Sequence, residues 1–149
     1  MAISYDVFTG AFLAKITEFD FADMTNARRT SLVDQYMKRA VVQFQRNCLY
    51  DLAGNMDDTS RTFQVDVLDS DVDELAEIVS EGMIVQWLKP FVYQQENLEN
   101  KLNSADWSVY SPAELLHHIG NAYAKAQSDY TQMIREYSFV HGNLRSLHL

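Results

Sequence analysis

Apolar residues recur every three to four positions over a long stretch around residue 40, and this spacing constrains the fold more than any other feature. The apolar positions are Leu32, Val33, Tyr36, Met37, Ala40, Val41, Phe44, Cys48, Leu49 and Leu52. This pattern is typical of one face of an α-helix. We predict a helix over this stretch, with Thr30 or Ser31 capping its start and Gly54 in the left-handed conformation at its end.

The same spacing predicts two further helices earlier and later in the chain. One extends from about Val7 to Thr17 and the other begins at Ser70 or Asp71 and runs to Lys89. Pro90 is expected to kink or break the latter, because proline lacks the backbone donor that the helix needs. A helical period then continues over residues 91–102.

The last predicted helix has the clearest start signal. Ser111 can cap its first amides, Pro112 suits the first helical position, and Glu114 completes a capping box. The apolar period continues to about Ser138, which corresponds to a helix about 40 Å long. The predicted fold is therefore all-α, a small helical bundle in a single domain (residues 1–149) with one long C-terminal helix.

Two short segments depart from the helical pattern. Within residues 61–67, apolar and polar residues alternate as in a β-strand, and a lone strand needs a partner, which we expect in another subunit. Residues 139–149 are predicted to form an extended C-terminal arm. The apolar residues of the two segments are Phe63, Val65, Val67, Phe139, Val140, Leu144, Leu147 and Leu149. We predict that they form an interface with a neighbouring subunit or another protein.

The net charge of −9 is concentrated in one segment. Residues 51–81 contain ten acidic residues and one base, Arg61, so the rest of the chain is neutral. An acidic chain is a poor binder of nucleic-acid phosphates, which attract lysine and arginine. The plain interpretation of the segment is a solvated loop and helix start.

No set of residues has the spacing of a known catalytic or metal site. Asp69, Asp71 and Asp73 lack the glycine and the glutamate that complete a calcium loop. His117 and His118 are adjacent, so on a helix they point about 100° apart and cannot easily face one metal. We therefore predict that the protein is not an enzyme and binds no metal or cofactor.

The single cysteine and the lack of sorting signals suggest a reducing compartment. Cys48 has no second cysteine to pair with, and its apolar helical neighbours predict a buried thiol. The first ten residues do not resemble a signal peptide, and no apolar stretch is long enough for a membrane helix. We expect no contact with a membrane.

Several short strings of the sequence resemble the neck proteins of tailed bacteriophages. The strings in the middle of the chain are Asp58–Phe63 (DTSRTF), Met83–Pro90 (MIVQWLKP) and Glu96–Leu98. Those near the end are Ser111–Leu116 (SPAELL), Ile134–Phe139 (IREYSF), Gly142–Leu144 and Leu147. The resemblance covers about the last two-thirds of the chain. The family is the head–tail connector proteins, also called adaptor or head-completion proteins.

The resemblance implies a structural virion protein without enzymatic activity, located in the neck and present in the host cytoplasm during assembly. Members of the family form a ring, often of twelve copies, beneath the portal protein. The ring extends the DNA channel, lets DNA pass without specific binding, and docks the next neck or tail protein. Stopper and tail-terminator proteins also form small rings, and the predicted helical content favours the adaptor.

In such a ring, the acidic segment would suit the channel wall, because a negative lining repels DNA phosphates. The acids that we expect to line the channel are Asp57, Asp58, Asp69, Asp73 and Glu77. The apolar residues of the two irregular segments would contact the neighbouring subunit or the portal protein.

The alternative is an acidic helical regulatory or inhibitory protein that mimics DNA and acts by binding another protein. A DNA mimic needs acids spread over a long surface, whereas here the excess lies in one segment. The sequence therefore favours the connector.

Overall fold

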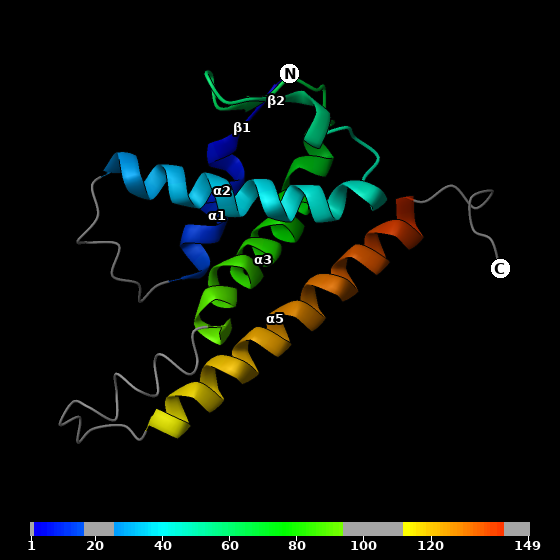
Figure 1. Cartoon of the computed structure of the whole chain (residues 1–149). Helices are drawn as coiled ribbons and strands as arrows, with labels where there is room; N and C mark the ends of the chain where they lie inside the picture. Colours follow the sequence, from blue (N-terminus) through cyan, green and yellow to red (C-terminus); the bar gives the residue numbers. More distant parts are fainter. Residues whose placement is uncertain (1, 17–25, 94–111, 142–149) are drawn as a thin grey trace.

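A computed structural model describes residues 2–16, 26–93 and 112–141 of the chain (Figure 1). Their secondary structure runs β1 (Ile3–Ser4), α1 (Tyr5–Lys15), α2 (Asn26–Phe44), β2 (Met56–Asp57), β3 (Thr62–Phe63), α3 (Asp69–Tyr93) and α5 (Pro112–His141). Two short 3-10 turns, Gln45–Asn47 and Ala53–Asn55, lie between α2 and β2. The helices have 11, 19, 25 and 30 residues, so they contain more than half of the 149-residue chain. The predicted helical bundle is confirmed.

The helices α1, α2 and α3 meet in one core. In Figure 1, α2 crosses in front of α1 and α3, while α5 lies diagonally along α3. Phe12 of α1 is fully buried, and its ring makes edge contacts with Tyr36 of α2 and Trp87 of α3, both at 6.2 Å between centroids. Met37 and Val79 are also fully buried. The apolar face predicted around residue 40 is therefore the side of α2 that faces the core.

A small three-stranded sheet closes one end of the bundle. The central strand is β3, which pairs antiparallel with β1 on one side and β2 on the other. Phe63 lies opposite both Ile3 and Met56 in the registers, and its ring packs against Tyr5 at 4.9 Å and Phe8 at 5.3 Å. The expectation that the strand pairs with another subunit is wrong, because both of its partners, β1 and β2, belong to this chain. Each partner has only two residues, which is too short to show an alternating pattern in the sequence.

Burial also corrects part of the predicted interface. Phe63 is fully buried, Val67 is 5% exposed, and Val65 is half-buried and packs against the core. Phe63 and Val67 are therefore core residues of this chain, and the prediction that they contact a partner is wrong.

The helix α2 has different ends from those predicted. It begins at Asn26, so Thr30 and Ser31 lie inside it rather than at a cap. It ends at Phe44, and Gly54 lies in a 3-10 turn without a left-handed conformation. The apolar period continues past the helix because the following loop folds back on the core and buries Leu52 completely.

The helix α3 begins at Asp69 and continues through Pro90 to Tyr93, so the proline does not end it. Pro90 is exposed and lies close to the end of α3, where a lost hydrogen bond disturbs few neighbours. The predicted continuation over residues 94–102 lies outside the described residues.

The helix α5 begins at Pro112, as predicted, and extends to His141. Phe139 and Val140 therefore belong to the helix, and the prediction that they start an extended arm is wrong. The cap predicted at Ser111 and the remaining arm residues, Leu144, Leu147 and Leu149, lie outside the described residues.

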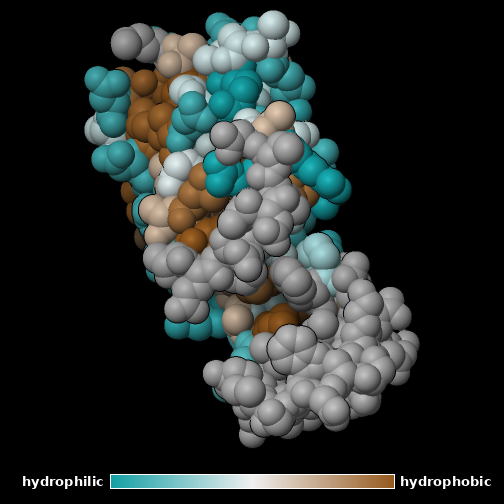
Figure 2. All heavy atoms as spheres, turned by 90° about the vertical axis from the view of Figure 1, so that its left-hand side faces the viewer, coloured by the Kyte–Doolittle hydropathy of each residue, from teal (hydrophilic) through white to brown (hydrophobic). Residues whose placement is uncertain are grey.

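Figure 2 shows the molecule turned by 90° about the vertical axis from the view of Figure 1, with the end that carries the sheet again at the top. Apolar side chains reach the surface in patches that hydrophilic side chains border. Large apolar residues that are exposed on α1 and α2 are Val7, Leu13 and Val42. Some apolar area of the described residues therefore lies outside the core.

Candidate functional site

A continuous groove crosses α2, α3 and α5. Its central hollow has a volume of about 390 Å³. The lining comes from Gln43 of α2, from Asn47 of the 3-10 turn that follows it, from Val85, Gln86 and Lys89 of α3, and from Tyr123, Gln127, Tyr130, Thr131, Ile134 and Arg135 of α5. A neighbouring hollow of about 370 Å³ shares Gln43, Gln86 and Lys89 and continues along α2. A third hollow, of about 410 Å³, shares Gln127, Thr131 and Arg135 and continues along α5.

The charged side chains that line this groove are all basic. They are Lys38, Arg39, Lys89 and Arg135, and none of the described lining residues is acidic. Arg39 and Arg135 are exposed, and neither forms an ion pair with a described residue. A chain with a net charge of −9 thus carries a locally positive surface. Because a guanidinium offers a planar fork of donors, this groove can bind carboxylates or phosphates.

Close packing of three helices forms the floor of the groove. Tyr130 of α5 is buried, and its hydroxyl donates a 2.7 Å hydrogen bond to the carbonyl oxygen of Ala40 in α2. Burial raises the pKa of Tyr130 above its usual value of 10. Gly82 of α3 lies under the ring, where a Cβ atom would come within 2.6 Å of the Tyr130 Cζ atom. The groove therefore has a rigid base.

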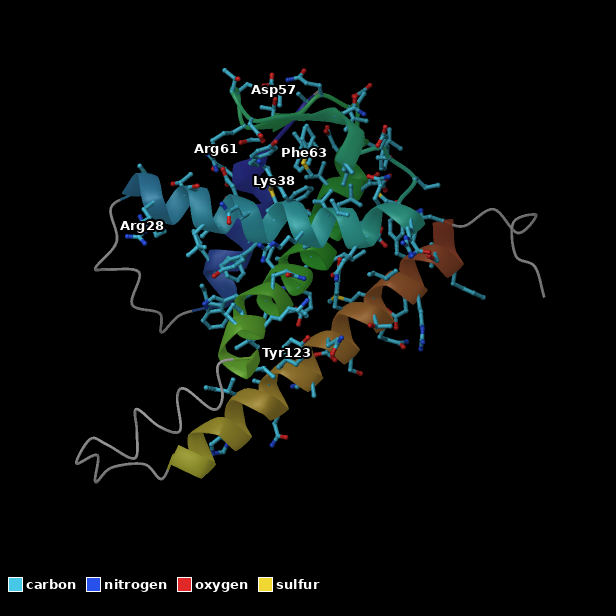
Figure 3. The ribbon with its side chains drawn as sticks, viewed as in Figure 1. Arg28, Lys38, Asp57, Arg61, Phe63 and Tyr123 are labelled. Carbon is cyan, nitrogen blue, oxygen red and sulfur yellow. The ribbon has the colours of Figure 1, made fainter. Side chains whose placement is uncertain are left out.

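A network of charged residues holds the β2–β3 hairpin on α1 and α2 (Figure 3). Arg61 has a positive φ of 53°, which is strained for a residue with a side chain. Its guanidinium makes two hydrogen bonds to Asp34 of α2, at 2.8 and 2.9 Å, and one to Asp6 of α1 at 2.8 Å. These bonds hold Arg61 in the strained conformation and raise its pKa further above its usual range.

Asp58 of the same hairpin binds two partners. Lys38 Nζ lies 2.8 Å from its Oδ1 atom, and the Tyr5 hydroxyl donates a 2.9 Å hydrogen bond to the same oxygen. The hydrogen bond from Lys38, followed by that from Tyr5, holds the pKa of Asp58 below its usual value. Lys38 also lines the basic groove, so Asp58 of the hairpin lies at the edge of this groove.

The five acids predicted to line a channel have different surroundings. Asp57 accepts hydrogen bonds from the backbone amides of Thr59 and Ser60, so it stabilises its own turn. Asp58 pairs with Lys38, and Glu77 lies 3.1 Å from Lys15 of α1. The remaining two, Asp69 and Asp73, are exposed at the start of α3 and form no ion pair with a described residue. Three of the five predicted acids therefore already have partners within the chain, and two form no ion pair with a described residue.

The C-terminal end of α5 combines exposed apolar side chains with a fixed base. Phe139 is 81% exposed and Val140 is 71% exposed. On the opposite side, the Tyr137 hydroxyl is buried and accepts a hydrogen bond from the backbone amide of Leu49. His141 Nε2 lies 3.1 Å from a Glu74 carboxylate oxygen of α3. This end of α5 is thus held in place and presents an apolar tip.

The described residues contain no evident centre for chemistry. No group of three or more histidine, cysteine, aspartate or glutamate side chains within them could hold a metal ion. Cys48 is half-buried rather than fully buried, with its Sγ atom 4.0 Å from the Tyr137 hydroxyl. Burial raises the pKa of the Cys48 thiol, and a protonated thiol is a weak nucleophile. Among the helices of the described residues, none is long and apolar enough to cross a membrane.

Sequence reasoning missed the groove because its residues come from three distant helices. The available signal was the row of bases and amides on the polar side of α2, including Lys38, Arg39 and Gln43. A row of this kind usually indicates a solvated helix face. Only the packing of α3 and α5 beside it adds Lys89 and Arg135 and forms a concave surface.

No protein-family profile, curated protein or solved structure matches the chain.

Proposed function

We propose that this protein is a head–tail connector of the adaptor type, which forms a ring beneath the portal in the neck of a tailed bacteriophage. The observation that carries the proposal is the position in the fold of the strings that resemble this family. Asp58–Phe63 contains the hairpin with Arg61 and Phe63, which holds α1 and α2 together. Residues that join distant parts of the chain are constrained by the fold, so the resemblance at these positions supports the proposal.

The other strings support the same argument. Met83–Pro90 forms the part of α3 that contains the buried Trp87 and the groove residue Gln86. Ile134–Phe139 forms the last turns of α5, with Tyr137 buried and Phe139 exposed. Residues that hold the fold and residues that face outward both occur in these strings, as expected for a protein that acts by assembling.

A connector needs separate surfaces for its neighbours in the ring, the portal and the next neck protein. The described residues offer three that differ in chemistry: the basic groove, the acidic start of α3 and the apolar tip of α5. We assign the apolar tip, Phe139 and Val140, to the portal or the next neck protein. Phe139 and Val140 are adjacent in the chain, and contiguous exposed apolar surface is what marks a protein interface.

The hairpin acids Asp57 and Asp58 are our candidates for the channel wall. Their test is the rate of DNA ejection from particles that carry Asp57→Asn and Asp58→Asn, measured at several salt concentrations. Weaker repulsion of the phosphates should slow ejection at low salt, and the difference should shrink as salt screens the charges. Equal rates at every salt concentration would exclude these acids from the channel wall.

The assembly itself can be tested with purified full-length protein, alone and mixed with the portal protein of the same phage. We expect native mass spectrometry to detect a ring of about a dozen copies on the portal. A protein that stays monomeric in both samples is not a connector.

The DNA-mimic alternative would then be tested by measuring whether the protein binds nucleic-acid enzymes. Two of the acids that a DNA mimic would need, Asp58 and Glu77, already pair with Lys38 and Lys15.

A further inference from the structure

Two arginines of the basic groove, Arg39 and Arg135, form no ion pair within the described part of their own subunit. Arg39 lies on the α2 side of the groove and Arg135 on its α5 side, with Gln86 between them on α3. Both arginines are exposed. Arg39 lines one hollow and Arg135 lines the adjoining ones, so a segment that spans them with two negative charges would pair with both guanidinium groups. The groove is therefore suited to a segment with at least two negative charges.

The same chain carries a segment with this chemistry at the start of α3. Asp69 and Asp73 are four residues apart on one helix, so they lie on the same face. Both are exposed and form no ion pair with a described residue, whereas the neighbouring Asp71 accepts a 2.6 Å hydrogen bond from the Tyr50 hydroxyl. The positive end of the helix dipole favours negatively charged side chains in the first turns of α3.

These two surfaces cannot meet within one subunit. Asp69 and Lys89 are both part of α3, and twenty residues of helix separate them by about 30 Å. The packing of α1, α2 and α5 on α3 keeps this helix in place. A contact between the acidic start of α3 and the groove must therefore join two different copies of the protein.

We propose that the groove binds the acidic start of α3, with Asp69 and Asp73, of a neighbouring copy. This inference rests on the proposed ring and identifies the contact that builds it. The contact joins two different surfaces, so each copy donates one and accepts the other. Repeated contacts of this head-to-tail kind close into rings when the rotation between copies allows it. Asp69 and Asp73 then face the next subunit rather than the channel.

Nucleic acid is the other anion that could occupy the groove, but the surroundings favour carboxylates. Lys38 at the edge of the groove already pairs with Asp58, and Asp57 lies in the same hairpin. A phosphate backbone that continued past the groove would approach these acids and a chain with a net charge of −9. A short acidic helix end from a copy of the same protein avoids this repulsion.

A charge-swap experiment on the full-length chain tests the contact. One variant carries Arg39→Glu and Arg135→Glu in the groove, and the other carries Asp69→Lys and Asp73→Lys on α3. Each variant alone should form rings at least tenfold more weakly than the wild-type protein, because the two surfaces then have like charges. An equimolar mixture of the two should assemble again with alternating subunits. A single chain with all four changes should also form rings.

The matched control carries Arg46→Glu and Lys125→Glu, which change the charge by the same amount at exposed positions outside the groove. This control should assemble like the wild-type protein. Circular dichroism and thermal unfolding of each variant show whether the subunits are folded. Analytical ultracentrifugation and native mass spectrometry, with and without the portal protein, measure the assembly.

The outcomes separate this inference from the proposed function. Rings that form normally from each charge-reversed variant would overturn the inference and leave the connector function intact. Loss of duplex DNA binding in the groove variant, with normal rings, would assign the groove to nucleic acid and also overturn it. A wild-type protein that forms no ring, with or without the portal, would instead contradict the proposed function before any variant is compared.

Discussion

Arg61 and Asp34 are joined by two parallel hydrogen bonds, of 2.9 Å from Nε and 2.8 Å from Nη2, although they are 27 residues apart in the chain. The Asp34 side chain is 15% exposed, so water screens this pair only in part. The pair ties the hairpin to α2 and holds Arg61 at its positive φ. Two hydrogen bonds between charged partners are usually stronger than neutral ones.

We predict that Arg61→Lys lowers the free energy of unfolding by about 1–2 kcal/mol, because a lysine ammonium cannot reproduce the two parallel bonds. Urea unfolding followed by circular dichroism measures this change. Arg46→Lys is the matched control, since Arg46 is exposed and forms no ion pair with a described residue, and it should stay within about 0.5 kcal/mol. Equal stabilities of the two variants would show that the paired bonds are not important.

Gly82 allows α3 to approach α2 and α5 closely. In Gly82→Ala the new Cβ would lie 2.6 Å from Tyr130 Cζ and 2.9 Å from Ala40 Cβ. Tyr130 is buried and hydrogen-bonded, so it cannot move away freely. We expect a loss of about 1–3 kcal/mol in the free energy of unfolding.

The control is Gly120→Ala in α5, where no atom lies within 4 Å of the position that the new Cβ would occupy. This change should stabilise the protein by up to about 1 kcal/mol, because alanine favours helix more than glycine does. Thermal unfolding of the two variants gives the comparison. A stabilised Gly82→Ala variant would contradict the close packing of the three helices.

The apolar tip of α5 should matter for assembly and not for folding. Phe139 and Val140 are exposed, so Phe139→Ser with Val140→Ser should change the free energy of unfolding by less than about 0.5 kcal/mol. Under the proposed connector function, the same double variant should lose binding to the portal or the next neck protein. Cosedimentation with each protein measures the binding. Unchanged binding to both would remove this tip from the interface.

Asp58 should contribute to stability in a pH-dependent way. Its folded pKa lies below its usual value of 3.8, chiefly because of the bond from Lys38. The stabilisation is therefore present above the unfolded pKa and is lost as pH falls through the folded value. We expect Asp58→Asn to lower the unfolding midpoint at pH 7, and the difference from the wild-type protein to shrink below about pH 4.

Asp73→Asn serves as the comparison for Asp58→Asn, because Asp73 is exposed and forms no ion pair with a described residue. It should have little effect on the unfolding midpoint at pH 7. Denaturation in urea across pH 3 to 7 measures both variants. A constant difference between Asp58→Asn and the wild-type protein over this range would show that ionisation of Asp58 does not stabilise the fold.

The helical content could be predicted from the sequence because each helix shows its own local period. The apolar face around Met37 and the start of α5 at Pro112 both agree with the structure. The ends of α2 could not be predicted, since Leu52 continues the apolar pattern from a loop that folds back on the core. Local periodicity reports burial, and it does not distinguish a helix from a loop that packs in the same place.

The sequence by itself determined the mostly helical class, the long C-terminal helix and the separation of charge along the chain. Only the tertiary structure decided where Phe63 lies, because its neighbours Ile3 and Met56 come from other parts of the chain. The basic groove also depends on the fold, because Arg39 and Arg135 are 96 positions apart and line adjoining hollows only when α5 packs along α3. Contacts between distant residues leave no periodic pattern in the sequence, and they decided which surfaces this protein can offer to a partner.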